Sequence, residues 1–373
     1  MKKILTLLTT LILSLALSSC NQGKGADLVV LSWGEYISDD VIKEFEELNN
    51  VSVKVVSTDS NESMYTMIQN KTSEYDIAIP SDYMIHQMMV ENMIYKLDYS
   101  LLPNYNDSLF VPELKALMDG DDMIEYDGYY VPYFWGSLGI MYSNKRISNM
   151  GDIVKEVGMK IFYEEDLRPE GCKIAMYNGS RDALASAEIY LGYSLNTKDH
   201  NEIDAAMNLI KSMGFETWGT DDLKIDVSKG NIDVALVYTG DYFDVYYSDM
   251  ESGNEANLKT YGIYSPEDHN NIFLDAMVIP KTSSNVSLAH SFINHMISYD
   301  ASYENASYVG YCPTIKDVYN DIMVDEDFED VVANRAYSPV NILKNKDSIG
   351  EVYRFLGSDT FRYIEKRYTE VLF

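Results

Sequence analysis

Apolar positions in the first hundred residues alternate between short strand-like runs and helical faces. The runs at Leu28–Ser32, 52–57 and 75–79 are rich in Val, Ile and Leu, which is typical of buried parallel strands. Apolar spacings of three and four predict helices over 41–48 behind the caps Asp39 and Asp40, from Asn61 onwards, and from the cap Ser81 to Met93. The β-α-β-α-β-α order predicts a parallel sheet covered by helices on both faces.

A second alternation follows residues 133–136. Strands are expected at 139–143, 172–176 and 232–238, with helices at 180–191 and 202–213 between them. A further strand is expected at 275–279, and helices dominate from Ser287 onwards. The chain of 373 residues exceeds one compact core, so the pattern predicts an α/β protein of two domains.

The N-terminus indicates export. Residues 4–17 form an apolar stretch after a basic start, too short to cross about 30 Å of hydrocarbon as a helix. The run 17–20 (LSSC) resembles the bacterial lipoprotein cleavage box, which implies cleavage before Cys20 and lipid on its thiol. We therefore expect a signal peptide at 1–19, a lipidated tether at 20–26 and anchoring to a membrane without spanning it. The alternative is an ordinary signal in which Cys20 is incidental.

The net charge of the chain limits the classes of molecule that it is expected to bind. A net charge of −30 argues against nucleic acid and against a polybasic membrane contact, but permits cationic ligands. The five His show no metal-ligand spacing, and no phosphate or dinucleotide motif is present, so neither a metal nor a cofactor is expected. Cys172 and Cys312 lie far apart in sequence, and free thiols are favoured over a disulfide.

An acid stands between two aromatic residues directly after the first strand, in Trp33-Gly34-Glu35-Tyr36. Ligands of open α/β sheets bind at the carboxyl ends of strands. A carboxylate there can pair with an ammonium, while the rings cover methylenes or make cation–π contacts worth roughly 0.5–2 kcal/mol. This pattern predicts a site for an organic cation; the alternative is a strand end with surface aromatics.

Eight segments in order resemble the spermidine/putrescine-binding proteins of bacterial polyamine ABC importers. They are 33–37 (WGEYI), 59–65 (DSNESMY), 75–83 (YDIAIPSDY), 131–136 (VPYFWG), 180–182 (SRD), 191–197 (LGYSLNT), 272–275 (IFLD) and 310–314 (GYCPT). The resemblance covers nearly the whole mature chain. It implies a type II periplasmic-binding-protein fold with a ligand cleft between two α/β lobes. Lobe 1 is expected at 27–135 and 276–316, and lobe 2 at 136–275 and 317–373.

The resemblance also implies which residues contact the ligand. They are Trp33, Glu35, Tyr36, Ser81, Tyr83, Asp182, Tyr238, Asp241, Phe273, Asp275 and, less closely aligned, Tyr353. Tyr238 and Phe273 stand where relatives have Trp, and Asp241 stands where putrescine-type members have an acid. Gly179 lies where spermidine-type members can carry an acid, and Gly34 replaces a hydroxyl residue. The choice between diamine and triamine therefore stays open. Trp135 is expected in the core.

The physical chemistry of a polyamine fits such a site. Its ammonium groups recur every three or four methylenes and need acids spaced along a groove with apolar walls. Buried carboxylates without partners would cost several kcal/mol, so the empty cleft is expected to be open and wet and to close by a hinge motion.

The function expected from this resemblance is capture of putrescine or spermidine by a monomeric, extracytoplasmic lipoprotein that delivers it to an ABC permease. It is not expected to be an enzyme. The same fold could instead bind another organic cation, a sugar or iron. A hydrolase using Glu35 and Asp275, and a surface sensor or adhesin, are the remaining alternatives.

Overall fold

The computed structural model describes residues 25–71, 74–120 and 123–373. The expected signal peptide, Cys20 and most of the tether lie outside these residues, so the predictions made for them stay predictions. Within the described ranges, no helix combines the length and the apolar composition that crossing a bilayer requires.

The smaller sheet has β1 (Leu28–Ser32) at its centre. It pairs in parallel with β2 (Val53–Ser57) on one side and β3 (Ile77–Ala78) on the other. The connecting helices are α2 (Asp39–Asn49), α3 (Asn61–Gln69) and α4 (Asp82–Val90). The predicted alternation of parallel strands and helices is therefore confirmed.

Two predicted ends of these helices are wrong. The side chain that caps α2 is Ser38, which accepts a hydrogen bond from Asp40 N, while Asp39 and Asp40 occupy the first turn. Acids in the first turn are favourable because the helix dipole is positive there. Helix α4 stops at Val90, short of Met93, because Asn92 adopts a left-handed φ of 57° that cannot continue the helix.

The larger sheet is built around β4 (Val131–Ser143), which is buried along its whole length. Its strand order is β11-β9-β4-β7-β5-β6, and β8 and β10 also pair with β4. The other strands are β5 (Ile174–Tyr177), β6 (Thr217–Gly219), β7 (Val234–Tyr238), β8 (Tyr261–Tyr264), β9 (His269–Met277), β10 (Cys312–Pro313) and β11 (Ile349–Glu351). The expected strand at 139–143 is thus only the second half of β4, and the strand expected from Asp275 begins six residues earlier.

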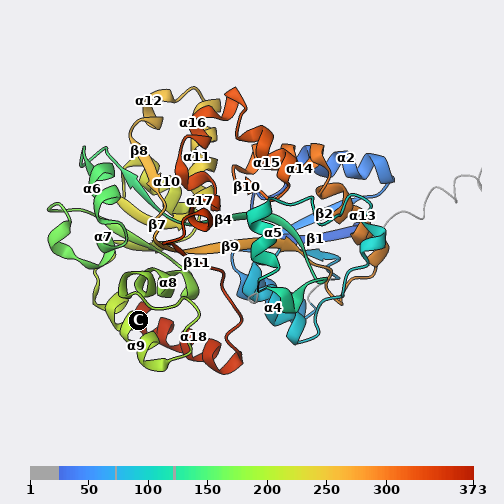
Figure 1. Cartoon of the computed structure of the whole chain (residues 1–373), viewed down its shortest axis with the longest axis horizontal. Helices are drawn as coiled ribbons and strands as arrows, with labels where there is room; N and C mark the ends of the chain where they lie inside the picture. The colour runs from blue at the N-terminus through green and yellow to red at the C-terminus, as the bar shows by residue number, and fades with distance from the viewer. Residues whose placement is uncertain (1–24, 72–73, 121–122) are drawn as a thin grey trace, which may run out of the picture.

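Strands β4 and β9 link the two parts of the molecule, the first built on the smaller sheet and the second on β5, β6 and β7 of the larger sheet (Figure 1). The chain at the end of β9 pairs with the smaller sheet through an antiparallel bridge between Val278 and Ala78. The other half of β4 pairs with β7 and β8 in the second part. The expected lobe boundaries at 135/136 and 275/276 fall inside these two continuous strands, and the boundaries themselves stay predictions.

Helices surround both sheets (Figure 1). The first part also carries α5 (Pro112–Met118), α13 (Val286–Met296), α14 (Tyr299–Val309) and α15 (Lys316–Ile322). The second carries α6 (Met150–Val157), α7 (Lys160–Tyr163), α8 (Ser180–Leu191), α9 (His200–Ser212), α10 (Asp222–Lys229), α11 (Thr239–Glu251), α12 (Glu255–Leu258), α16 (Glu329–Val332), α17 (Val340–Lys344) and α18 (Ser358–Leu372). The predicted bounds of α8 are confirmed, and α9 begins two residues before the predicted start. The C-terminal helix α18 returns to pack on α8 and α9.

The core includes two features expected from the sequence. Trp135 is fully buried on β4, and its Nε1 donates to Pro313 O at 3.2 Å. Cys172 and Cys312 are both free thiols, as favoured above.

Candidate functional site

A cavity of about 320 Å³ opens where the carboxyl ends of β1, β5 and β7 meet β9. This volume lies at the lower end of the range for small-molecule sites, roughly 300–1,000 Å³. The predicted contacts that line it are Trp33, Glu35, Tyr36, Ser81, Tyr83, Asp182, Tyr238, Asp241, Phe273 and Asp275. The structure thus brings together residues that are up to 242 positions apart in the chain, leaving Tyr353 as the predicted contact that does not line the cavity.

Asp275 lies within β9 and is held by two hydroxyl groups. Tyr36 Oη donates to its Oδ2 at 2.6 Å, and Ser81 Oγ donates to its Oδ1 at 2.6 Å. Asn61 Nδ2 in turn donates to Ser81 Oγ at 3.0 Å. The hydroxyl of Ser81 therefore serves Asp275, and the predicted side-chain cap of α4 is not made. Burial raises the pKa of Asp275 to about 6, against the two hydrogen bonds, which lower it.

Asp182 lies in the first turn of α8. Tyr238 Oη donates to Asp182 Oδ1 at 2.6 Å, and Tyr353 Oη approaches the same oxygen at 3.4 Å. Burial raises the pKa of this carboxyl to about 6, and the bond from Tyr238 opposes the rise. A Cβ on Gly179 would collide with Asp182 Oδ2, so the glycine leaves the space that the carboxylate occupies. In this arrangement position 179 cannot carry a second acid.

Asp241 lies in the first turn of α11. Its Oδ2 accepts from the backbone N–H of Tyr238 at 3.0 Å, and its Oδ1 accepts from Tyr311 Oη at 3.1 Å. Burial raises the pKa of Asp241 to about 6, while the positive charge of Lys224 lowers it and the negative charge of Asp221 raises it. Asp182, Asp241 and Asp275 are 8%, 5% and 6% exposed, so this conformation encloses all three carboxyl groups.

Aromatic rings fill the space between these acids. The Tyr238 ring lies 4.9 Å from that of Phe273, and the Phe273 ring lies 5.9 Å from that of Tyr311, measured between ring centroids. Tyr36 meets Tyr311 at 5.4 Å, and Tyr177 meets Tyr238 at 5.2 Å. The cavity therefore presents a continuous aromatic wall with a carboxylate beside each of three tyrosine hydroxyls.

Glu35 and Trp33 occupy a different part of the cavity. Glu35 is exposed and adopts a left-handed φ of 51°, and no side-chain hydrogen bond holds it within the described chain. Trp33 is partly buried, and its Nε1 has no hydrogen-bond partner among the described residues. Glu35 therefore faces solvent at the mouth of the cavity, whereas the indole nitrogen of Trp33 is buried. Tyr83 lies deeper and donates to Glu62 Oε1 at 2.8 Å.

Tyr353 lies behind the cavity wall. It is 2% exposed, and its hydroxyl points to Asp182 and to the carbonyl of Arg181, both at 3.4 Å. The guanidinium of Arg181 lies 4.7 Å from the centre of the Tyr353 ring. Tyr353 therefore does not line the cavity in this conformation; it supports Asp182 from behind, and its predicted contact with the ligand stays a prediction.

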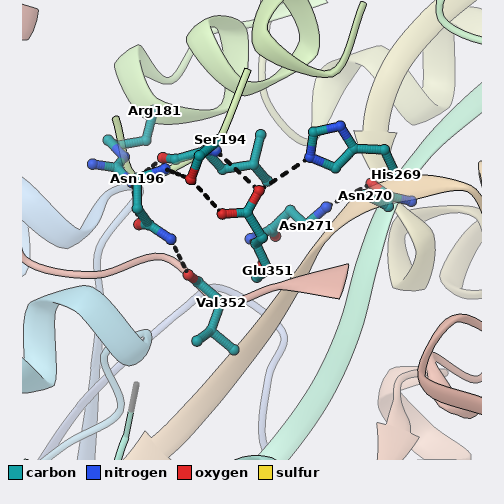
Figure 2. Close-up of polar contacts among 9 residues, drawn as sticks. Arg181, Ser194, Asn196, His269, Asn270, Asn271, Glu351 and Val352 are labelled. Carbon is teal, nitrogen blue, oxygen red and sulfur yellow. Dashed lines mark hydrogen bonds and ion pairs between the residues drawn. The ribbon is translucent and has the colours of Figure 1, made fainter. Parts of the chain in front are cut away.

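The segment that carries Tyr353 is fixed by the loop after α8 (Figure 2). Asn196 Nδ2 donates to Val352 O at 2.8 Å, and Asn196 Oδ1 accepts from Arg354 N at 2.8 Å. Glu351 accepts from Ser194 Oγ at 2.6 Å and lies 3.1 Å from His269 Nε2 (Figure 2). The segment 191–197 thus anchors the strand β11 and the tyrosine that follows it.

Several lining residues escaped the sequence reasoning. They include Tyr177, Lys224, Tyr311 and Glu365. Tyr311 belongs to the segment 310–314, one of the eight segments that carry the resemblance. Its place in that segment could have identified it as a site residue. Its ring packs where a Cβ on Gly240 would stand, so Gly240 next to Asp241 was a second signal. Glu365 comes from α18 and accepts a hydrogen bond from Ser180, a contact that only the tertiary fold creates.

Comparison with known proteins places this site in a family. Residues 40–333 match the family described as bacterial extracellular solute-binding protein. The chain belongs to this family. This solute-binding protein has the predicted type II periplasmic-binding-protein fold, with the cavity between its two lobes. The family consists of binding proteins and is extracytoplasmic.

Individual relatives cover most of the solute-binding protein. A putrescine-binding periplasmic protein, SpuD of Pseudomonas aeruginosa, is 28% identical over 78% of this chain and 79% of its own. A crystal structure of the spermidine/putrescine ABC transporter substrate-binding protein PotD from Streptococcus pneumoniae is 26% identical, with a TM-score of 0.69 over 92% of this chain and 98% of that chain. A lipoprotein of Treponema pallidum shares the fold with a TM-score of 0.74 over 92% and 98% at 22% identity.

Proposed function

We propose that this solute-binding protein captures linear polyamines outside the cytoplasm and delivers them to the permease of an ABC importer. The observation that carries the proposal is the set of three enclosed aspartates, each bonded to a tyrosine hydroxyl and separated by aromatic rings. The proposal is also supported by the relatives, whose names describe them as proteins for putrescine or spermidine.

The electrostatics of the cavity favour a cation over a neutral solute. Burying ionised carboxylates is costly unless a positive partner is present. An ammonium group would supply that partner and form charge-assisted hydrogen bonds worth about 1.5–3 kcal/mol each. The rings of Tyr238, Phe273 and Tyr311 would cover the methylenes of the ligand. A sugar would leave the charges of the acids uncompensated.

Further properties belong to the same proposal. The protein would act as a monomer without catalysis, and lipid on Cys20 would hold it at the outer face of the cell membrane or in the periplasmic space. Its ligand-free form would be open, and the enclosed conformation described above would be the form that surrounds the ligand.

The test is isothermal titration of the protein without its first 20 residues, all of which lie outside the described fold. Unfolding and refolding remove carried-over ligand, and putrescine, cadaverine, spermidine and spermine are then titrated separately. A Kd in the micromolar range or below for at least one of them is expected. A folded protein that binds none of the four would refute the proposal.

A further inference from the structure

A lysine side chain lies in the wall of the pocket among the acids. Lys224, on α10, lines the same cavity as Asp241 and Asp275. Its Nζ lies 2.6 Å from Asp244 Oδ2, and the Lys224 side chain is only 13% exposed. Neither the resemblance nor the proposed function accounts for a buried ammonium of the protein itself inside a site for external ammonium groups.

The surroundings of Lys224 keep it charged. Burial alone would lower the pKa of the amine, but the negative charges of Asp241, Asp244 and Asp221 outweigh that effect and raise it. The lysine thus supplies a permanent positive charge at the end of the pocket occupied by Asp241.

The other two acids are placed differently. Asp275 has hydroxyl partners, and no ion pair to it occurs among the described residues. Arg181 also lines the cavity and its charge lowers the pKa of Asp182, but its guanidinium donates to Leu195 O at 2.9 Å and stacks over the Tyr353 ring instead of pairing with that carboxylate. The protein itself therefore supplies an ammonium group beside Asp241, whereas Asp275 depends on the ligand for a cation.

We infer that Lys224 acts as an internal ammonium group that occupies the third cation position of the pocket and thereby restricts the ligand to diamines. This inference rests on the proposed function. A diamine can place its charges at the acids away from Lys224. The additional ammonium of a triamine would have to pair with Asp241, where Lys224 already supplies an ammonium group and like charges repel strongly.

The test compares putrescine with spermidine by isothermal titration for the wild type and for Lys224→Met. The wild type should bind putrescine more tightly. Removing the ammonium exposes Asp241 and Asp244 to the ligand, so the affinity ratio of spermidine to putrescine should rise about tenfold or more. Lys224→Arg keeps the charge and should leave the ratio near that of the wild type.

A matched control removes an exposed charge from the same helix. Lys229→Met changes the net charge equally outside the cavity and should leave the ratio unchanged. If Lys224→Met destabilises the fold, Lys224→Gln provides the neutral variant, and the wild-type ranking is informative by itself. A wild type that prefers spermidine, or a neutral variant with an unchanged ratio, would overturn the inference while leaving polyamine capture intact. Failure of the wild type to bind any polyamine would instead overturn the proposed function and the inference with it.

Discussion

Replacing Asp275 by Asn should weaken ligand binding and stabilise the ligand-free protein at the same time. The carboxylate is enclosed at 6% exposure with neutral partners, Tyr36 and Ser81. In the proposed complex it pairs with an ammonium, a contact worth about 1.5–3 kcal/mol, so Asp275→Asn should raise the Kd for putrescine by more than tenfold.

The stabilisation follows from the pKa of the same group. Burial raises the pKa of Asp275 from 3.8 to about 6. The folded protein therefore holds this proton more tightly than the unfolded chain, and the free energy of unfolding falls as pH rises from about 4 to 6. At pH 7 the ionised group costs up to about 3 kcal/mol, since a tenfold change in proton affinity corresponds to about 1.4 kcal/mol. Opening of the pocket relieves part of this cost, which makes the figure an upper limit.

Two measurements test both effects. Titration with putrescine gives the change in affinity, and urea unfolding at pH 7 and pH 4 gives the change in stability. The variant should be more stable than the wild type at pH 7 and equal to it near pH 4, where the wild-type carboxyl is protonated. Asp166→Asn removes an exposed charge and is the control. An unchanged Kd would remove Asp275 from the ligand site, and a variant less stable at pH 7 would refute the electrostatic reasoning.

Three other outcomes are expected. Lowering the pH from 7 to 5 without ligand protonates Asp182, Asp241 and Asp275, whose pKa values are about 6 in the enclosed form, and so favours closure. Small-angle scattering should then give a smaller radius of gyration at pH 5, and equal radii would contradict this. Asn196→Ala removes two hydrogen bonds to the segment after β11 and should lower the free energy of unfolding by about 1–3 kcal/mol in urea, whereas no change would make that contact dispensable. Cys20→Ser should move the protein from the membrane to the soluble fraction of cells, and retention in the membrane would argue against lipidation.

Local sequence patterns predicted the smaller sheet well because each of its strands and helices has its own apolar periodicity. The strands of the larger sheet were harder to predict from the sequence. Strand β4 is buried throughout, yet only its second half was predicted as a strand, because Pro132, Gly136 and Gly139 interrupt the pattern. The start of β9 is polar in sequence but buried, and Asn270 is tolerated there because its Nδ2 donates to Leu138 O at 2.9 Å. Such satisfied polar groups leave no hydrophobic signal.

The predicted site depended on the resemblance more than on periodicity. Segments such as 33–37 and 272–275 carry recognisable residues, and the cavity collects them. Lys224 and Glu365 stand on amphipathic helices where a charged residue reads as a solvated face. Only the packing of α10 and α18 against the rest of the lobe turns these side chains into the pocket.

The hydrogen bonds that the protein already makes to its three enclosed aspartates limit how many N–H donors of a ligand these acids can accept. A carboxylate offers about four acceptor positions, and Asp182, Asp241 and Asp275 each use two of them within the protein. About two positions on each acid are left for the ligand. A primary ammonium carries three N–H donors, so an ammonium group at Asp182 or at Asp275 brings one donor more than that acid can still accept. The donors of the protein, four tyrosine hydroxyls with Ser81 Oγ and the backbone N–H of Tyr238, therefore limit how many N–H groups of a ligand each acid can accept.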